Sequence, residues 1–441
     1  MEYHEGVIED PQVPEEASAS RSTGRGLAAL RHRDYALFWS GALLSNIGNW
    51  VQTTALLWVV KEMTGSNAWV AAVNMAAYLP VLLFVVFAGL LADSANRKRI
   101  VIVTVVVQMA CAAALAVTAA AGVASLPVLL ALVFVAGTAY TFSAPAAVSF
   151  LPDLVPPGEM MSALSLSTAQ FNIGRVIGPA LGAILLTVWS PAGAFTINAI
   201  SFVFVLAAFI MVRPRERQVT RPLTDVRRQI ADGFVFVLDH RWRLYSLLAL
   251  GAATFFGFSC TVLFPSLAKD VLHGKASTYG LLMSMLGVGA AVGAPLVTRL
   301  SRRFAESSII RAGTLGLGVF LVCLSLARSV WLAALIAPGI GCCFLMMCSA
   351  VNTSLQGRSE RGMRGRMVSL YSLMWLGMFG VGGQFIGYLA DAASVPTAFL
   401  IGGIACICVA LLLALMPASI AGASIALGVE KSPVRAVAAA S

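Results

Sequence analysis

The sequence predicts an all-α membrane protein with twelve transmembrane helices in two pseudo-symmetric six-helix bundles. Three features lead to this fold class: the composition, a succession of long apolar runs, and a repeat that relates the two halves. Of the 441 residues, 59% are hydrophobic and 11% are charged, and the mean hydropathy is +0.86. A soluble domain cannot bury that much apolar surface, so the lipid bilayer is the expected surrounding.

The apolar runs are each long enough to cross a bilayer, which takes about 20 residues in a helix. The first six helices are expected at 36–62, 68–92, 99–122, 126–148, 161–189 and 193–212. The second six are expected at 244–269, 277–300, 308–327, 330–354, 366–391 and 395–417. The sequence therefore predicts an N-terminal bundle over residues 35–212 and a C-terminal bundle over residues 244–417.

Three polar segments flank or join these bundles. Residues 1–34 are expected to form a disordered cytoplasmic tail, because the first 20 carry six acids and no Lys or Arg. Residues 213–243 hold eight arginines and are expected to be a cytoplasmic linker with a short amphipathic helix over 223–238. Residues 418–441 form a C-terminal tail.

The distribution of Lys and Arg predicts the orientation in the membrane. With both termini in the cytoplasm, 25 of the 30 cations fall on the cytoplasmic side, and Arg175 lies within a span. Only Lys61, Lys269, Lys275 and Arg328 fall on the other side. Because short loops rich in Lys and Arg stay inside, this asymmetry favours cytoplasmic termini.

An internal repeat supports two related halves. A shift of about 205 residues lays Gly178–Gly182 over Gly383–Gly387, and with a one-residue slip it brings Arg97 onto Arg302. Two parallel repeats joined by a linker are typical of transporters that bind substrate between their halves.

Composition and motifs argue against several other classes. The cations lack the interleaved aromatics of a nucleic-acid surface, so no nucleic-acid partner is expected. All four histidines fall outside the spans, so neither a metal site nor a general base is expected there. No phosphate-binding loop is present. The eight cysteines lie in apolar runs and are interpreted as small buried hydrophobes. We expect no enzyme and no cofactor, and a monomer that draws on an ion gradient if it transports uphill.

A polar bend between the second and third helices is the most informative stretch. It reads Gly89-Leu-Leu-Ala-Asp-Ser-Ala-Asn-Arg-Lys-Arg99, so that one acid, Asp93, precedes the cations Arg97, Lys98 and Arg99. The plain interpretation is a helix-ending acid that neutralises Arg97.

The fifth helix carries three glycines and a buried cation. Gly174, Gly178 and Gly182 recur every four residues, so they share one face and allow another helix to approach closely. Arg175 lies deep in this apolar helix, where an unpaired charge costs several kcal/mol. It either binds an anionic group in the interior or snorkels to lipid headgroups.

Polar side chains within other spans are candidates for a substrate path. Asn46, Asn49 and Thr53 share one face of the first helix. Further candidates from other helices are Asn74, Gln170, Asn352, Trp375 and Gln384. Hydrogen bonding between helices or ordinary core packing is the alternative for each. The acids Glu62, Asp270 and Asp391 sit at outer helix ends, as proton entry groups or as simple interfacial acids.

These motifs resemble the major facilitator superfamily. The bend is similar to its signature loop G-x-L-a-D-r-x-G-R-k-r, with Asn96 in place of glycine. Gly174–Ala183 resembles the antiporter motif g-x-x-x-G-P-x-x-G-G, with Ala183 in place of the last glycine. Together with Arg33–Trp39 and Ser45–Trp50, the resemblance points to the branch of bacterial drug and siderophore exporters.

The resemblance implies proton-driven export of amphiphilic small molecules by alternating access, in the bacterial cytoplasmic membrane. It implies an inner gate at Gly89, Asp93, Arg97 and Arg99, and a bending seam at Gly174, Gly178, Pro179 and Gly182. The implied partners are a small-molecule substrate, protons and the lipid bilayer.

Two departures from the family pattern leave the coupling and the function open to alternatives. The fourth helix lacks the arginine of many drug:proton antiporters, and no span has a carboxylate at mid-membrane, so coupling is expected through Asp34, Glu62 or Asp93. An uptake permease of the same fold and a membrane sensor or scaffold that transports nothing are the alternative functions.

Overall fold

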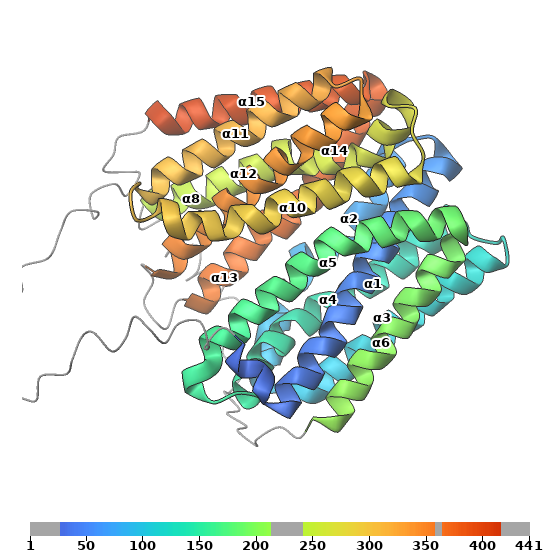
Figure 1. Ribbon diagram of the computed structural model, residues 1–441, viewed down its shortest axis with the longest axis vertical. Coiled ribbons are helices and arrows are strands. Elements are labelled where there is room, and N and C mark those ends of the chain that lie inside the picture. The colour runs from blue at the N-terminus through green and yellow to red at the C-terminus, as the bar shows by residue number, and fades with distance from the viewer. Residues whose placement is uncertain (1–26, 213–240, 358–363, 416–441) are drawn as a thin grey trace, which may run out of the picture.

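The computed structural model describes residues 27–212, 241–357 and 364–415, and this part of the chain contains helices and no strand. Figure 1 shows the helices as two layers, the earlier half of the chain in one and the later half in the other. The predicted linker helix at 223–238 and both predicted tails lie outside these ranges, apart from residues 27–34. The all-helical fold class is confirmed.

Six helices make up the first half. They are α1 (Arg33–Thr64), α2 (Asn67–Ser94), α3 (Arg97–Ala120), α4 (Leu126–Phe150), α5 (Met160–Val188) and α6 (Pro191–Met211). Polar residues at their starts satisfy free backbone N–H groups: Ser66 accepts from Trp69 N, and Asn96 accepts from Arg99 N. Gly65 ends α1 with a φ of 66°, which glycine adopts without strain.

The second half contains four regular spans and two irregular ones. The regular helices are α10 (Ala276–Leu300), α11 (Glu306–Leu326), α12 (Val330–Gly357) and α15 (Val395–Leu415). The span before them runs through α8 (Arg241–Ala252), η6 (Ala253–Gly257), η7 (Phe258–Leu263), α9 (Phe264–Ser266) and η8 (Leu267–Val271). The span before α15 runs through α13 (Arg364–Ser372), η9 (Leu373–Gly377) and α14 (Met378–Ala392). The segments η6, η8 and η9 are π-helical turns, which the apolar pattern did not predict.

Eleven of the spans in the described residues are long and apolar enough to cross a membrane. The twelfth, α1, has 32 residues but is more polar, since it carries Asn46, Asn49 and Gln52. It packs against α5 and α6 inside the first half, so the bundle shields these amides from lipid.

Helices pair in the same pattern in both halves. In the first half α2 packs on α4, α3 on α4 and α6, and α1 on α5 and α6. In the second half α10 packs on α12, α11 on α12 and α15, and the irregular first span on α14 and α15. This correspondence agrees with the repeat expected from the sequence.

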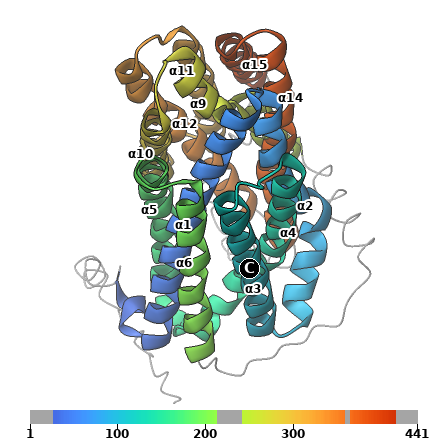
Figure 2. The ribbon, with the colours of Figure 1, turned by 90° about the vertical axis from the view of Figure 1, so that its right-hand side faces the viewer.

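Two helix pairs join the halves, α5 with α10 and α2 with α14. They lie on opposite edges of the interface in Figure 2. Glycines allow close contact at both: a Cβ on Gly280 would lie 2.8 Å from Pro179 O, and one on Gly387 would lie 2.6 Å from Ala71 Cβ. The two layers approach each other toward the right of Figure 1 and diverge toward its left.

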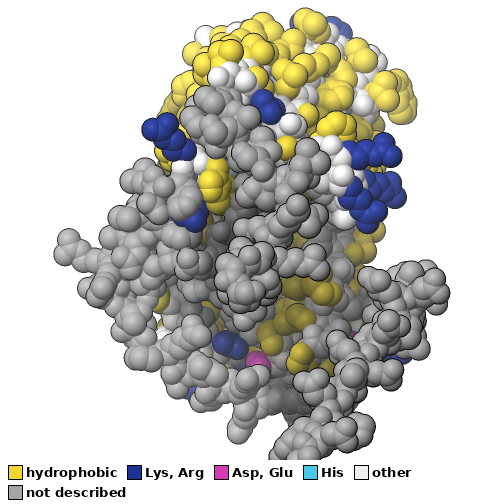
Figure 3. Space-filling view, turned by 90° about the vertical axis from the view of Figure 1, so that its left-hand side faces the viewer, with side chains coloured by type: hydrophobic (Ala, Val, Ile, Leu, Met, Phe, Trp, Pro, Cys, Tyr) yellow, Lys and Arg dark blue, Asp and Glu magenta, His cyan; other side chains and the backbone are white. Residues whose placement is uncertain are grey.

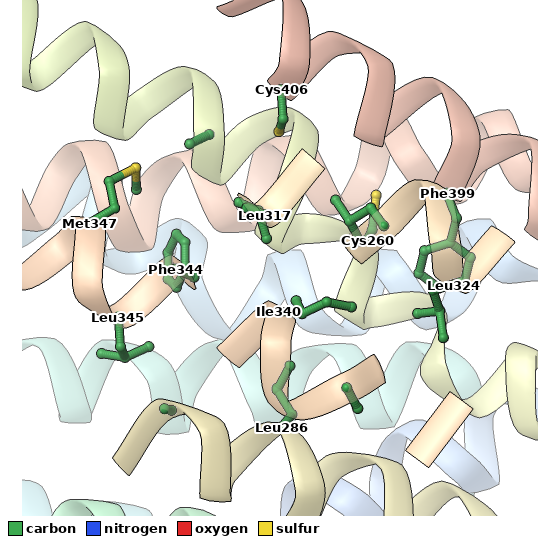
Figure 4. Packing of buried hydrophobic residues seen from close by; sticks show 14 of the residues in the cluster. Cys260, Leu286, Leu317, Leu324, Ile340, Phe344, Leu345, Met347, Phe399 and Cys406 are labelled. Atoms are coloured by element: carbon green, nitrogen blue, oxygen red, sulfur yellow. The ribbon is translucent and has the colours of Figure 1, made fainter. Parts of the chain in front are cut away.

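The core of the second half is apolar and includes cysteines. Figure 4 shows Cys260 and Cys406 among Leu317, Phe399 and neighbouring side chains. The expectation of eight buried cysteines is wrong for some of them: Cys323 and Cys408 are exposed, and Cys342 and Cys343 are partly exposed. Lipid can cover the exposed thiols of Cys323 and Cys408 as well as protein can, whereas Cys343 packs against Gly316 of α11.

Candidate functional site

At one end of the interface, a carboxylate of the second half accepts hydrogen bonds from the first half. Asp391, at the end of α14, accepts hydrogen bonds from Ser66 Oγ at 2.5 Å, Asn67 N at 2.8 Å and Ala68 N at 2.9 Å. These groups form the amino terminus of α2, where free N–H groups and the helix dipole favour a negative charge. The acid of one half therefore caps a helix of the other.

A salt bridge crosses the interface beside this cap. Lys61 of α1 is only 3% exposed, and its Nζ lies 2.7 Å from Asp270 Oδ2 in η8. The same ammonium donates to Gly65 O at 2.7 Å and to Asn67 Oδ1 at 3.2 Å. We call the four residues Lys61, Ser66, Asp270 and Asp391 the latch, and their end of the molecule the latched end.

The predicted gate loop lies at the other, diverging end and makes its described contacts within the first half. Arg97 donates from Nη1 to Ser149 O at 2.9 Å and from Nε to Ala92 O at 3.4 Å, and it lies 3.8 Å from Asp153. Lys98 Nζ donates to Val212 O at 2.7 Å.

The other members of the predicted gate are less engaged. Arg99 is exposed, and a Cβ on Gly89 would meet nothing within 4 Å. Asp93 lies in the last turn of α2, and its side chain is not among the atoms described. The gate role of this loop therefore stays a prediction.

The glycines of α5 bring its backbone against α1. A Cβ on Gly174 would lie 3.1 Å from Asn46 Cβ, and one on Gly178 would lie 2.3 Å from Trp50 Cβ. One on Gly182 would lie 3.0 Å from Val51 O. Pro179, on the next face, turns its carbonyl toward α10, so α5 lies between α1 of its own half and α10 of the other.

Arg175 lies inside the bundle, with 4% of its surface exposed. Its guanidinium carbon lies 5.6 Å from the Trp50 ring centre and 5.1 Å from the Phe171 ring centre. Nε and Nη1 are sealed from solvent and have no hydrogen-bond acceptor. The burial excludes a side chain that snorkels to headgroups.

The polar face of α1 divides between two neighbours. Asn49 Oδ1 and Gln52 Oε1 accept from Asn198 Nδ2 of α6 at 3.3 and 2.8 Å. Thr53 donates to Asn49 O in its own helix at 2.8 Å. These three groups bond within the first half, while Asn46 packs against Gly174 of α5.

The remaining candidates lie in separate places. Asn74 and Gln384 lie on the α2–α14 pair, where Gln384 Nε2 donates to Ala68 O at 3.3 Å. In the second half, Asn352 accepts from Gln356 at 2.7 Å, and Trp375 packs edge-on against Phe344 and Tyr371. Gln170 is buried in α5, one turn before Gly174. The structure thus brings Asn46 against Gly174, the residue before Arg175, but it does not bring the whole predicted set together.

Sequence reasoning missed Lys61 and the rings around Arg175. The charge distribution identifies Lys61 only as an outer cation, although a lone Lys at the end of an apolar span indicates a partner. Trp50 and Phe171 gave no separate signal, because aromatic residues are common in membrane helices.

The sequence matches the family model described as "transmembrane secretion effector" over residues 24–432, which is most of the chain.

Curated relatives cover most of their own length as well. The chain is 25% identical over 379 residues to a staphyloferrin A transporter of Staphylococcus aureus, covering 84% of this chain and 93% of the relative. It is 25% identical over 383 residues to the multidrug efflux pump Tap of Mycolicibacterium fortuitum, covering 81% and 90%. It is 25% identical over 385 residues to macrolide efflux protein A of Streptococcus pyogenes, covering 85% and 93%.

Solved structures share the fold at low identity. A bacterial homologue of the lysosomal transporter Spinster, in an inward-facing and unoccupied conformation, superposes with a TM-score of 0.68 at 14% identity, covering 89% of this chain and 98% of that one. The nucleoside transporter NupG superposes with a TM-score of 0.69 at 12% identity, covering 87% and 98%.

Proposed function

The chain belongs to the transmembrane secretion effectors of the major facilitator superfamily, and on this basis we propose that it exports an amphiphilic small molecule by proton-coupled alternating access. As a member of this superfamily it is a multi-pass membrane transporter and not an enzyme. The observation that carries the mechanism is the asymmetry of the interface between its halves. Charged and capped contacts cross it at the latched end, whereas the basic loop at the diverging end bonds within one half.

We assign the diverging end to the cytoplasm. Figure 3 looks onto that end and shows Lys and Arg side chains among its described atoms. Exposed cations there include Arg99, Arg302 and Arg303, in loops of the kind that stay inside. The structure is then an inward-facing state, and both termini lie in the cytoplasm of a bacterial cell whose cytoplasmic membrane holds the protein.

Amphiphilic compounds are the proposed cargo. The relatives are named as transporters of staphyloferrin A, of multiple drugs and of macrolides. The aromatic side chains of Trp50, Phe171 and Trp375 are partly exposed. Such a surface suits molecules with large apolar parts.

The latch acids are the proposed proton-responsive groups. Asp270 and Asp391 are the described carboxylates that bond across the halves, and both face the outside in the proposed orientation. A proton on Asp391 removes the charge that favours the α2 amino terminus, so protonation from outside weakens the latch. The cytoplasmic gate then closes through Asp93, Arg97 and Arg99.

Vesicle transport tests the direction and the coupling. Everted membrane vesicles energised by respiration should accumulate a macrolide or the amphiphilic anion dansylaminoundecanoic acid, and nigericin, which collapses the pH gradient, should abolish the accumulation. Accumulation only in right-side-out vesicles would instead identify an uptake permease, and ligand binding without movement in either orientation would identify a sensor.

The gate carries its own prediction. Asp93→Asn should abolish export while the protein reaches the membrane in normal amount, because a neutral amide cannot make the charged closing contact. Unchanged drug accumulation in cells that express the variant would reject the gate role of Asp93.

A further inference from the structure

We infer that Arg175, with Trp50 and Phe171, forms a binding subsite for a carboxylate of the transported molecule. The inference rests on the proposed transport function and adds the chemical class of its substrate. It predicts a monoanionic amphiphile whose carboxylate is attached to an aromatic or alkyl body.

The unsatisfied guanidinium is the first step of the argument. A buried guanidinium that lacks acceptors is destabilising by several kcal/mol, so buried arginines normally have partners. Arg97 and Arg311, which are partly buried, each bond to backbone carbonyls. Arg175 is more deeply buried than Arg97, yet its Nε and Nη1 have no acceptor.

The neighbours of Arg175 do not supply a counter-ion. The groups that act on it electrostatically are Tyr78 of α2, Cys348 of α12 and Tyr371 of α13. All three are ordinarily neutral, and none of the three described salt bridges includes Arg175. The positive charge therefore lacks a counter-ion among the described residues.

The groups around Arg175 determine the charge and the chemical class of the ligand. A guanidinium presents parallel N–H donors that match the two oxygens of a carboxylate. Among the described residues, the groups that act on Arg175 include no second Lys or Arg, so a single negative charge is balanced here, whereas a phosphate dianion would lack a partner. Trp50 and Phe171 flank the charge and remain partly exposed, so an apolar group next to the carboxylate finds aromatic surface.

The position of Arg175 connects this subsite to movement of the halves. A Cβ on Gly287 of α10 would lie 3.2 Å from Arg175 Cγ, so the second half packs directly on its stem. Tyr78 belongs to the first half, and Cys348 and Tyr371 belong to the second. A carboxylate bound there contacts a group whose surroundings change when the halves rock.

Binding can be measured without transport. The full-length protein is placed in nanodiscs of zwitterionic phosphatidylcholine and titrated with dansylaminoundecanoic acid and with its methyl ester, by fluorescence. We expect the acid to bind about tenfold more tightly than the ester, the ratio that a charge-assisted pair worth 1.4 kcal/mol gives. Arg175→Gln should bring the two affinities together, and Arg175→Lys should keep only part of the preference because the fork of donors is lost.

Arg243→Gln is the matched control. Arg243 is also buried, at 6% exposed, and lies 5.4 Å from the Trp242 ring, but it belongs to α8 of the other half. Its loss should leave the acid preference unchanged. Thermal unfolding of each variant identifies any that fails to fold, and Arg175→Lys, which keeps charge and size, then decides the question.

Three results would overturn the inference. The first is an unchanged acid preference in Arg175→Gln, or in Arg175→Lys if the glutamine variant does not fold. The second is an equal loss of the acid preference in Arg243→Gln. The third is displacement of the acid by phosphatidylglycerol in the nanodisc, which would assign Arg175 to a lipid headgroup. A protein that moves nothing across vesicles yet keeps an Arg175-dependent acid preference would refute the proposed function and leave this inference standing.

Discussion

Removal of the charge at Asp391 should unlatch the two halves. In the structure this carboxylate accepts three hydrogen bonds at the amino terminus of α2. Asp391→Asn keeps the size and one oxygen acceptor, but it loses the charge and at least one of the three bonds. Because these bonds exist only when the latched end is closed, their loss destabilises this state and not the opposite one.

The size of the effect follows from the type of contact. Loss of a helix cap costs about 0.5–2 kcal/mol, and loss of an anion at a helix amino terminus costs about 0.3–1 kcal/mol. Asp391 is exposed, so water screens the interaction and a total of about 1–2 kcal/mol is expected. The ratio of latched to unlatched molecules should therefore fall by a factor of about 5 to 30.

Distances between spin labels can measure this ratio. Labels at Met63→Cys and Lys275→Cys report on the latched end from the two halves, in a background in which the exposed Cys323 and Cys408 are serine. Asp391→Asn should increase the long-distance population. Glu62→Gln is the control, because this exposed acid lies at the same end without a described salt bridge to the other half. An unchanged distribution in Asp391→Asn, or an equal change in Glu62→Gln, would refute the reasoning.

Two further predictions concern stability and packing. Asp270→Asn should lower the melting temperature more than Lys61→Met does, and it should reduce the free energy of unfolding by about 1–3 kcal/mol. The reason is that Asp270→Asn leaves a buried ammonium without its counter-ion, whereas Lys61→Met leaves only a partly exposed carboxylate. The opposite order of melting temperatures would contradict the geometry. Gly178→Ala should reduce the free energy of unfolding by about 1–3 kcal/mol, since its Cβ would lie 2.3 Å from Trp50 Cβ. Gly158→Ala should leave the melting temperature unchanged, because a Cβ there meets nothing within 4 Å. Equal melting temperatures for the two variants would show that α5 and α1 are not closely packed.

Hydropathy predicted the helices because each span must be apolar along its length. It missed the irregular turns at Ala253–Gly257 and Leu373–Gly377, since a π-helical turn changes the hydrogen-bond register without changing apolar character. It also placed the start of α1 at residue 36, whereas the helix begins at Arg33. Arg33 and Asp34 are polar, so an apolar pattern cannot include them.

The candidate site was less predictable because its contacts are distant in the sequence. Asp391 was identified as an outer acid, but its partner Ser66 lies 325 residues away, and no local pattern joins them. The stripe of Asn49 and Thr53 suggested a polar path, yet Asn49 bonds to Asn198 of α6. A period of three or four residues identifies a helix face, but it does not say which neighbour covers that face.

A reversible crosslink across the latch tests alternating access most directly. Met63→Cys with Lys275→Cys puts one exposed thiol on each half at the latched end and leaves the latch acids in place, again with Cys323 and Cys408 as serine. A bismaleimide that contains a disulfide should stop accumulation of dansylaminoundecanoic acid in everted vesicles, and dithiothreitol should restore it. Undiminished accumulation by the crosslinked protein would contradict the claim that the latched end must open for export.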